Sequence, residues 1–311
     1  MELLMRALKQ INSFKDGALN LLVIFLLVSC SSLQKPVPSS PTRGDKAAID
    51  DLKTDDEVPS SNASPPVESN SEANKKAPPK AEPHKVSANS FATLAKANRL
   101  EQMREEAMKV LASNANDVSS LNALAFVYFK KAKIGAARIV LERANEKNPN
   151  TPQVLTNLAV LDLADNEPAR ALTNLKRSYK IDDHNPETLG LIGSIYLQNH
   201  DFAKALLPLE QSYRNDKSNL KIANNYAVAL TKTKSYEQAQ KIYDEILAQN
   251  SRESEILLNY AGLLVDYLNK PKEGLNIIYK VKFIETERKD ILDLANKLEN
   301  RAKTALKSIK E

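Results

Sequence analysis

Small residues recur along this chain at one fixed step, the separation between Ala125 and Ala159, and no other feature of the sequence constrains the fold as strongly. We call this separation the repeat step. A second column of small residues begins at Ala137 and keeps the same step. A period in the range of roughly 20–50 residues indicates a repeat protein, in which each repeat buries its apolar face against its neighbours. The two columns consist of Ala125, Ala159, Gly193, Ala227 and Ala261, and of Ala137, Ala171, Ala205 and Ala239.

Large apolar residues surround both columns at helical spacing. In the first repeat Leu121 and Leu124 precede Ala125, and Leu141 follows Ala137 by one helical turn. Positions three, four and seven apart form one stripe on a helix, so each repeat carries two helices with a short polar break between them. Such a pair forms an antiparallel helical hairpin. Ala or Gly stands where a larger side chain would push the two helices apart.

The breaks and the helix starts carry suitable residues. Asn166, Asn199 and His200 stand in breaks and tolerate a left-handed backbone better than most residues. Pro152 and Pro186 stand where helices begin, and there the missing N–H costs nothing. We therefore predict a left-handed residue in each break and a helix start at each proline.

This pattern resembles the tetratricopeptide repeat family. The matching residues are Leu121, Leu124, Ala125, Tyr128, Ala137, Leu141, Ala144 and Pro149, while Asn225-Tyr226-Ala227 and Asn259-Tyr260-Ala261 are similar to the family's Asn-Leu-Gly triplet. The resemblance implies an all-α, tetratricopeptide-type helical-hairpin solenoid with N- and C-terminal capping helices. It covers 118–285, in repeats 118–151, 152–185, 186–219, 220–253 and 254–285.

The chain departs from the family pattern in three ways. There is no Trp, and Asp162 replaces the usual aromatic residue of the second repeat. The fifth repeat slips by one residue near Asn269, so Gly274 takes its second small position. Residues 88–117 are expected to form N-terminal capping helices or a degenerate repeat. Residues 286–311 carry apolar residues at helical spacing opposite a charged face and predict a capping helix, the alternative being a docking or coiled-coil helix.

Residues 1–29 have the layout of a signal peptide. Basic residues precede an apolar run, 19–28, that is too short to span a bilayer. The ending Leu27-Val28-Ser29-Cys30 resembles a bacterial lipobox, which implies acylation of Cys30 and cleavage before it. Cys30 is the only cysteine of the chain, which excludes an internal disulfide. The alternative is an ordinary signal sequence with an incidental cysteine.

The acyl anchor implied by this resemblance would be a stable one, since it supplies several chains' worth of buried CH2 groups. Ser31 follows Cys30 where an Asp would resemble an inner-membrane retention signal. The resemblance therefore implies an outer-membrane lipoprotein facing the periplasm. In a bacterium with one membrane, it implies a position on the outer face of the plasma membrane.

Residues 30–87 are expected to be a lipid-anchored disordered linker. Residues 31–90 contain no Phe, Tyr or Trp and hold nine of the fifteen prolines, so they cannot bury enough surface to offset the entropy of ordering. The relaxed end-to-end distance of such a linker is on the order of 40 Å. It serves either as a flexible tether that lets the folded part reach partners away from the membrane or as a spacer without a binding role.

The sequence shows no arrangement of residues suited to catalysis. His84, His184 and His200 are too scattered for a metal site, and the seven single glycines cannot make a phosphate-binding loop. The net charge of +5 arises from 44 basic and 39 acidic residues that alternate along the predicted helices, which is typical of a solvated surface and not of a nucleic-acid patch. We expect a non-enzyme without catalytic residues, metal, cofactor, nucleic acid or small-molecule substrate.

A partner-binding groove is expected on the first helix of each repeat, because stacked hairpins curve and these helices line the concave side. We assign to it the residues that should face away from the second helix of the hairpin. They are Asn122, Phe126, Phe129, Thr156, Val160, Leu163, Ser194, Leu197, Asn224, Val228 and Thr231, and also Leu258 and Val265 in the fifth repeat. The alternative places several of them, Phe129, Leu163 and Leu197 above all, in the core between repeats.

The expected function is that of a lipid-anchored scaffold of the cell envelope. It would bind an unidentified envelope protein in its groove and attach to the membrane through its acyl anchor. The layout is similar to that of tetratricopeptide lipoproteins of pilus assembly, gliding motility or cell-wall complexes. The alternatives are a peptidoglycan or carbohydrate binder, or an adaptor that recruits a cell-wall hydrolase.

Overall fold

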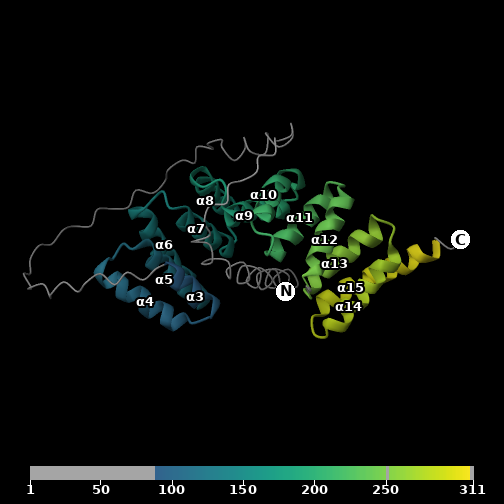
Figure 1. Ribbon diagram of the computed structural model, residues 1–311, viewed down its shortest axis with the longest axis horizontal. Helices are drawn as coiled ribbons and strands as arrows, with labels where there is room; N and C mark the ends of the chain where they lie inside the picture. The colour runs from purple at the N-terminus through teal and green to yellow at the C-terminus, as the bar shows by residue number, and fades with distance from the viewer. Residues whose placement is uncertain (1–87, 250–251, 309–311) are drawn as a thin grey trace, which may run out of the picture. The chain divides into compact units, whose positions relative to one another are not determined.

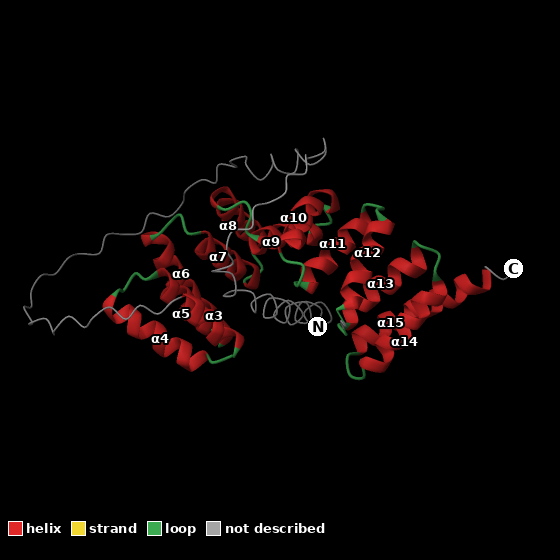
Figure 2. Ribbon diagram, viewed as in Figure 1, coloured by secondary structure: helices red, strands yellow, loops and turns green. Residues whose placement is uncertain are grey.

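The computed structural model describes residues 88–249 and 252–308, and in these ranges the chain forms thirteen α-helices and no strand (Figures 1 and 2). The predicted signal peptide, Cys30 and the linker lie outside the described residues. The described helices belong to two compact units that meet between Ile181 and Asp182 along the chain. Each unit is a succession of helical hairpins, which confirms the predicted all-α solenoid.

The first unit contains six helices in its described part. They are α3 (Ala88–Lys96), α4 (Leu100–Ser113), α5 (Val118–Lys130), α6 (Ile134–Lys147), α7 (Pro152–Ala164) and α8 (Pro168–Ile181). Each helix packs against the next one in the chain, and α5 also packs against α7. The first helices of successive hairpins therefore lie side by side, as a solenoid requires.

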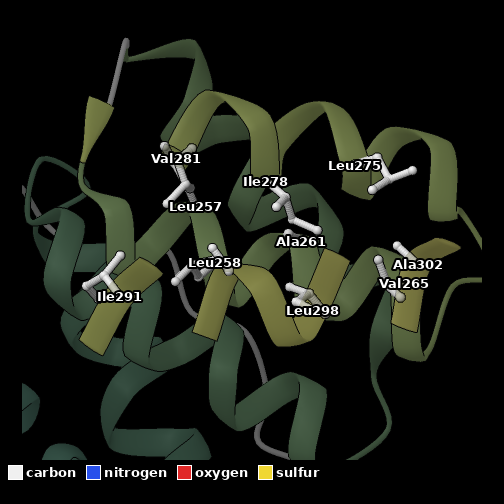
Figure 3. Close-up of a cluster of buried hydrophobic side chains, with 11 residues drawn as sticks. Leu257, Leu258, Ala261, Val265, Leu275, Ile278, Val281, Ile291, Leu298 and Ala302 are labelled. Atoms are coloured by element: carbon white, nitrogen blue, oxygen red, sulfur yellow. The ribbon is translucent and has the colours of Figure 1, made fainter. Parts of the chain in front are cut away.

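The second unit repeats this arrangement and adds a terminal helix. It contains α9 (Pro186–Gln198), α10 (Phe202–Asn215), α11 (Leu220–Lys232), α12 (Tyr236–Ala248), α13 (Ser254–Asp266), α14 (Pro271–Ile284) and α15 (Lys289–Ser308). The helices α9, α11 and α13 lie side by side, and α15 packs against both α13 and α14. Apolar side chains of these last three helices form one buried cluster that includes Leu257, Ile278 and Leu298 (Figure 3).

The small columns lie where the two helices of a hairpin cross. The eight alanines of the two columns are at most 1% exposed. At Gly193 an added Cβ would lie 2.5 Å from Cγ of Leu209 and 3.2 Å from its backbone nitrogen, so no side chain fits. At Gly274 an added Cβ would lie 2.4 Å from Cγ2 of Val265, as expected for the second small position of the fifth repeat. Close helix crossing thus explains both columns.

A left-handed residue ends the first helix of each hairpin, again at the repeat step. Asn166 and His200 have φ of 62° and 61°, as predicted, whereas Asn199 has a φ of −77°. Ala132 and Lys234 occupy the same place with φ of 56° and 68°. At each of these breaks the next backbone N–H bonds to a carbonyl five residues back, which closes the end of the helix.

Left-handed residues also occur in the first hairpin of the described chain and in the fifth repeat, where the position is shifted by one residue. Asn98, one repeat step before Ala132, has a φ of 53°, so α3 and α4 form a hairpin of the same kind as the repeats that follow. In the fifth repeat the left-handed residue is Asn269, which comes one residue later than the repeat step from Lys234 would place it. The slip seen in the sequence is therefore one extra residue in this turn.

Side-chain caps begin several of the first helices. Asp117, Asn185 and Asn219 each accept a hydrogen bond from the backbone N–H three residues later, at 2.8, 3.0 and 3.2 Å. These bonds satisfy N–H groups that have no partner inside the helix. Thr151 makes no side-chain cap, and Pro152 follows it at the first helical position.

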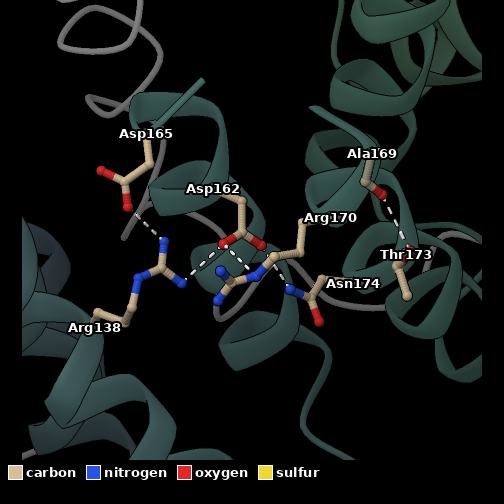
Figure 4. A network of polar contacts seen from close by, with 7 residues as sticks. All are labelled: Arg138, Asp162, Asp165, Ala169, Arg170, Thr173 and Asn174. Atoms are coloured by element: carbon tan, nitrogen blue, oxygen red, sulfur yellow. Dashed lines mark hydrogen bonds and ion pairs between the residues drawn. The ribbon is translucent and has the colours of Figure 1, made fainter. Parts of the chain in front are cut away.

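Asp162 is fully buried on α7 and lies in a polar network (Figure 4). Its carboxylate is 2.8 Å from a terminal guanidinium nitrogen of Arg138 on α6 and 3.4 Å from Nε of Arg170 on α8. Asn174 on α8 donates a hydrogen bond of 2.8 Å to its other oxygen. A buried ion pair therefore replaces the aromatic residue that the family usually has here, and it joins three successive helices.

Candidate protein-binding surface

The first helices of the second unit present an open face. On α13 the exposed residues Glu255, Asn259 and Asp266 follow each other at spacings of four and seven, which places them on one side of the helix. Gly262 lies between them, and a Cβ added there would meet no atom within 4 Å. This side of α13 is therefore open to solvent.

The corresponding face of α11 is polar as well. Lys221, Asn225 and Val228 are half-buried and Lys232 is exposed, each one repeat step before its counterpart on α13. Burial lowers the pKa of the Lys221 ammonium, and the nearby Glu253 and Glu255 carboxylates oppose this shift. A partly desolvated ammonium next to a carboxylate is suited to contacts with polar groups of a ligand.

We call this face the polar stripe. It comprises Glu187, Ser194 and Gln198 on α9, Lys221, Asn225, Val228 and Lys232 on α11, and Glu255, Asn259, Gly262 and Asp266 on α13.

Hydrogen bonds between neighbouring helices hold the amides of the polar stripe. Asn225 on α11 donates a bond of 3.0 Å from Nδ2 to Oγ of Ser194 on α9. Asn259 on α13 donates a bond of 3.0 Å from Nδ2 to Oδ1 of Asn224 on α11. Each bond uses one of several hydrogen-bonding positions of the donating amide and fixes its orientation. The stripe is therefore a row of oriented polar groups.

The groove residues predicted on the second unit lie beside or within the polar stripe. Ser194, Leu197, Asn224, Val228 and Thr231 are all half-buried. Ser194 and Val228 belong to the stripe, and Asn224 is bonded to it through Asn259. Leu258 and Val265, predicted on α13, are buried at 9% and 8% exposed. Asn225 and Asn259 are not among the predicted groove residues, and the role of the predicted residues in binding a partner stays a prediction.

The groove residues predicted on the first unit are buried. Asn122, Phe126, Phe129, Thr156, Val160 and Leu163 are at most 8% exposed. The ammonium of Lys130 lies 5.7 Å from the ring centroid of Phe126. Asn122 accepts a bond of 3.2 Å from Asn157 of the neighbouring first helix. Their role in binding a partner stays a prediction.

The predicted orientation of Thr156 is wrong. It was expected to face away from the second helix of its hairpin, but its hydroxyl lies 3.0 Å from Oγ of Ser178 on that helix. Ser178 in turn donates a bond of 3.2 Å to the carbonyl of Pro152 at the start of α7. The first helix is turned so that this position meets its own hairpin partner.

The residues that the structure describes contain no group of three His, Asp or Glu side chains placed to hold a metal ion. In the same ranges, every helix is either too short or too polar to cross a membrane. The expectation that the protein is not an enzyme stays a prediction.

Comparison with known proteins places the fold. The tetratricopeptide repeat family matches residues 196–258 of the chain. PilF of Pseudomonas aeruginosa is 17% identical with a TM-score of 0.59, and the match covers 67% of this chain and 95% of PilF. YrrB, described as a tetratricopeptide protein with an unusual peptide-binding site, is 12% identical with a TM-score of 0.51, covering 61% and 97% of the two chains.

A tetratricopeptide repeat protein from Parabacteroides merdae is 16% identical with a TM-score of 0.51, and the match covers 71% of this chain and 90% of that one. No curated protein matches the sequence. At such identities the structural matches show the fold alone. Together with the family match over 196–258, they support a tetratricopeptide repeat fold.

Proposed function

We propose that this protein is a lipid-anchored scaffold of the bacterial cell envelope that holds a partner polypeptide against the polar stripe. The observation that carries the proposal is the open position at Gly262, one helical turn after the oriented amide of Asn259 on α13, with the oriented amide of Asn225 on the neighbouring helix α11. The side-chain amides on this open helix face can donate hydrogen bonds to the backbone carbonyls of an extended chain and accept hydrogen bonds from its N–H groups. Such a face needs a partner of peptide chemistry.

Other features of the molecule support a polypeptide partner. None of the residues that make up the polar stripe is aromatic, whereas a carbohydrate site would require rings on which sugars stack. Charges of both signs occur on it, with Lys221 and Lys232 on α11 and Glu255 and Asp266 on α13. The structural neighbour YrrB is described as binding a peptide.

The membrane attachment rests on the sequence alone. The short apolar run, the lipobox-like ending and the single cysteine at Cys30 support acylation, and 30–87 would connect the anchor to the helical units. The layout supports an assembly role in an envelope machine such as a pilus, gliding or cell-wall complex. Replacement of Cys30 by Ser should abolish incorporation of a palmitate analogue in living cells, and a variant that is still labelled would refute the anchor.

The binding surface is tested by filling its open position. We expect Gly262→Trp to project a large ring into the stripe without disturbing the fold, because an added Cβ meets nothing there. A photo-crosslinking amino acid at Asn259 should capture the partner in cells, and Gly262→Trp should abolish this capture. The matched control is Gly135→Trp, since Gly135 on α6 is equally open. Undiminished capture by the Gly262 variant would refute the proposed surface.

A further inference from the structure

Helix α14 exposes two aromatic side chains on one face. Phe283 is 86% exposed, more than any other large apolar residue among those the structure describes, and Tyr279, one turn earlier, is 48% exposed. The opposite face of α14 is buried through Ile278 and Val281. One side of the helix is thus fully packed, and Tyr279 and Phe283 on the other side do not contribute to the hydrophobic core. Exposed apolar patches on folded domains usually mark a contact surface.

Lysines surround these two rings. Lys272 and Lys280 are exposed on the same face of α14, at helical spacing from Tyr279 and Phe283. Lys303 of the neighbouring helix α15 lies close enough to Tyr279 to interact with it electrostatically. The aromatic pair is therefore bordered by cations from two helices.

The charge of this surface is positive. Lys282 and Lys303 both bond to Glu299, Lys303 at 2.6 Å, and Lys307 follows Lys303 by one helical turn. We call this surface the α14 patch. It comprises Lys272, Glu273, Asn276, Tyr279, Lys280, Lys282, Phe283, Glu299, Lys303 and Lys307, so that five cations and two carboxylates leave a net charge of three.

We propose that the α14 patch is a peripheral membrane contact that rests on an anionic leaflet. Phe283 and Tyr279 would enter the headgroup region, and the lysines would lie over the anionic headgroups. Aromatic side chains bordered by lysines are the composition with which a helix face binds an interface. Basic residues near such a surface each add an attraction that salt weakens.

The shape and charge of the patch favour a membrane over other occupants. Phe283 protrudes from its helix, and a fluid interface accepts a protruding ring without a preformed pocket. A second copy of the chain would place like charges against each other. The predicted acyl anchor, on which this inference rests as part of the proposed function, would keep the patch close to a bilayer and raise its effective concentration there.

The test uses the chain without the predicted signal peptide 1–29 and with Cys30→Ser, so that any binding comes from neither the apolar run 19–28 nor an acyl chain. It is mixed with phosphatidylcholine vesicles that contain either no phosphatidylglycerol or about a third, and the bound fraction is measured by cosedimentation at low and physiological salt. We expect binding to the anionic vesicles, little binding to the neutral ones, and a decrease as salt is added.

Two variants locate the contact. Phe283→Ser should weaken the partition coefficient roughly fivefold to tenfold, because one ring no longer leaves water. Lys280→Glu changes the charge by two and should weaken it by about tenfold or more. The matched controls are Ile139→Ser, which removes a side chain that is 70% exposed on α6, and Lys297→Glu on another face of α15. Neither control should change binding, and circular dichroism should show all four variants folded.

Three results would overturn the inference. They are absence of binding to anionic vesicles at low salt, equal binding by the Phe283 and control variants, and binding that is no weaker to neutral vesicles. Capture of soluble polyglutamate without vesicle binding would indicate an acidic protein partner instead. Because the protein tested lacks the acyl chain, failure of the lipid-anchor proposal would leave these results unchanged and would be detected separately by palmitate labelling.

Discussion

Two glycines on first helices of the second unit should respond in opposite ways to the same substitution. Ala is more favourable than Gly inside a helix by roughly 0.5–1 kcal/mol. At Gly262 a Cβ meets nothing within 4 Å, so Gly262→Ala should stabilise the protein by about this amount. At Gly193 the Cβ would lie 2.5 Å from Cγ of Leu209, a fully buried side chain, and 3.2 Å from its backbone nitrogen. Overpacking of this kind costs about 1–3 kcal/mol.

The net expectation for Gly193→Ala is therefore a loss of roughly 1–2 kcal/mol, in contrast to the gain at Gly262. Urea unfolding followed by circular dichroism, with amide hydrogen exchange to report on the second unit, measures both free energies. Gly190→Ala provides an intermediate case, because its Cβ would meet the flexible end of Ile222 at 2.5 Å and Oγ of Ser212 at 3.0 Å. Equal shifts at Gly193 and Gly262 would refute the explanation of the small column by close helix crossing.

Three further predictions concern charge and backbone strain. Asp162→Asn should lower stability by about 1–3 kcal/mol, since it removes the buried carboxylate that Arg138 and Asn174 contact, while Arg138 keeps Asp165 as a counterion; an unchanged melting temperature would contradict this. Lys234→Gly should raise stability by about 1 kcal/mol by relieving a φ of 68°, whereas the control Lys241→Gly at an exposed position in the middle of α12 should lower it. Lys282 and Lys303 lower the pKa of Glu299 from 4.5 to about 2, so the stability that this pairing contributes is present above pH 4.5 and is lost as the pH falls toward 2. Urea titrations at pH 7, 4.5 and 2.5 should show a loss of about 1–3 kcal/mol that Glu299→Gln lacks, and parallel curves for the two proteins would refute it.

The hairpins were predictable because their geometry requires particular residue types. Only a small residue fits where helices cross, so Ala159 and Gly193 indicate the crossing wherever they recur. The left-handed turns were predictable at Asn166 and His200, whose side chains tolerate that backbone. They were not predictable at Ala132 and Lys234, because there the closing hydrogen bonds of the turn impose the conformation against the preference of the residue.

The exposed face of the first helices was only partly predictable, for a different reason. The repeat step shows which positions are equivalent, but it does not show how far each first helix is turned between its own hairpin partner and the next first helix. Thr156 was expected in the groove and lies against α8. Asn259 was noticed as part of a repeated triplet but was not assigned to the surface. Its exposure becomes evident only once α11 and α13 are side by side.

The ion-pair partners of Asp162 could not be predicted from the sequence. Arg138 and Arg170 each stand on a different helix from Asp162, so no spacing along a single helix could have paired them. These groups meet only because α6, α7 and α8 pack together. A charged residue in an aromatic position signals a departure, but its partners follow from the packing of three helices.

The terminal helix α15 has a consequence for self-association. Its residues Ile291, Leu298 and Ala302 cover the apolar side of α13 and α14, where a further repeat would otherwise stack. A chain ending after α14 would expose this apolar side to solvent. Copies could then bury it against the same side of a second copy or stack end to end. The helix that completes the core thus also removes a surface for self-association.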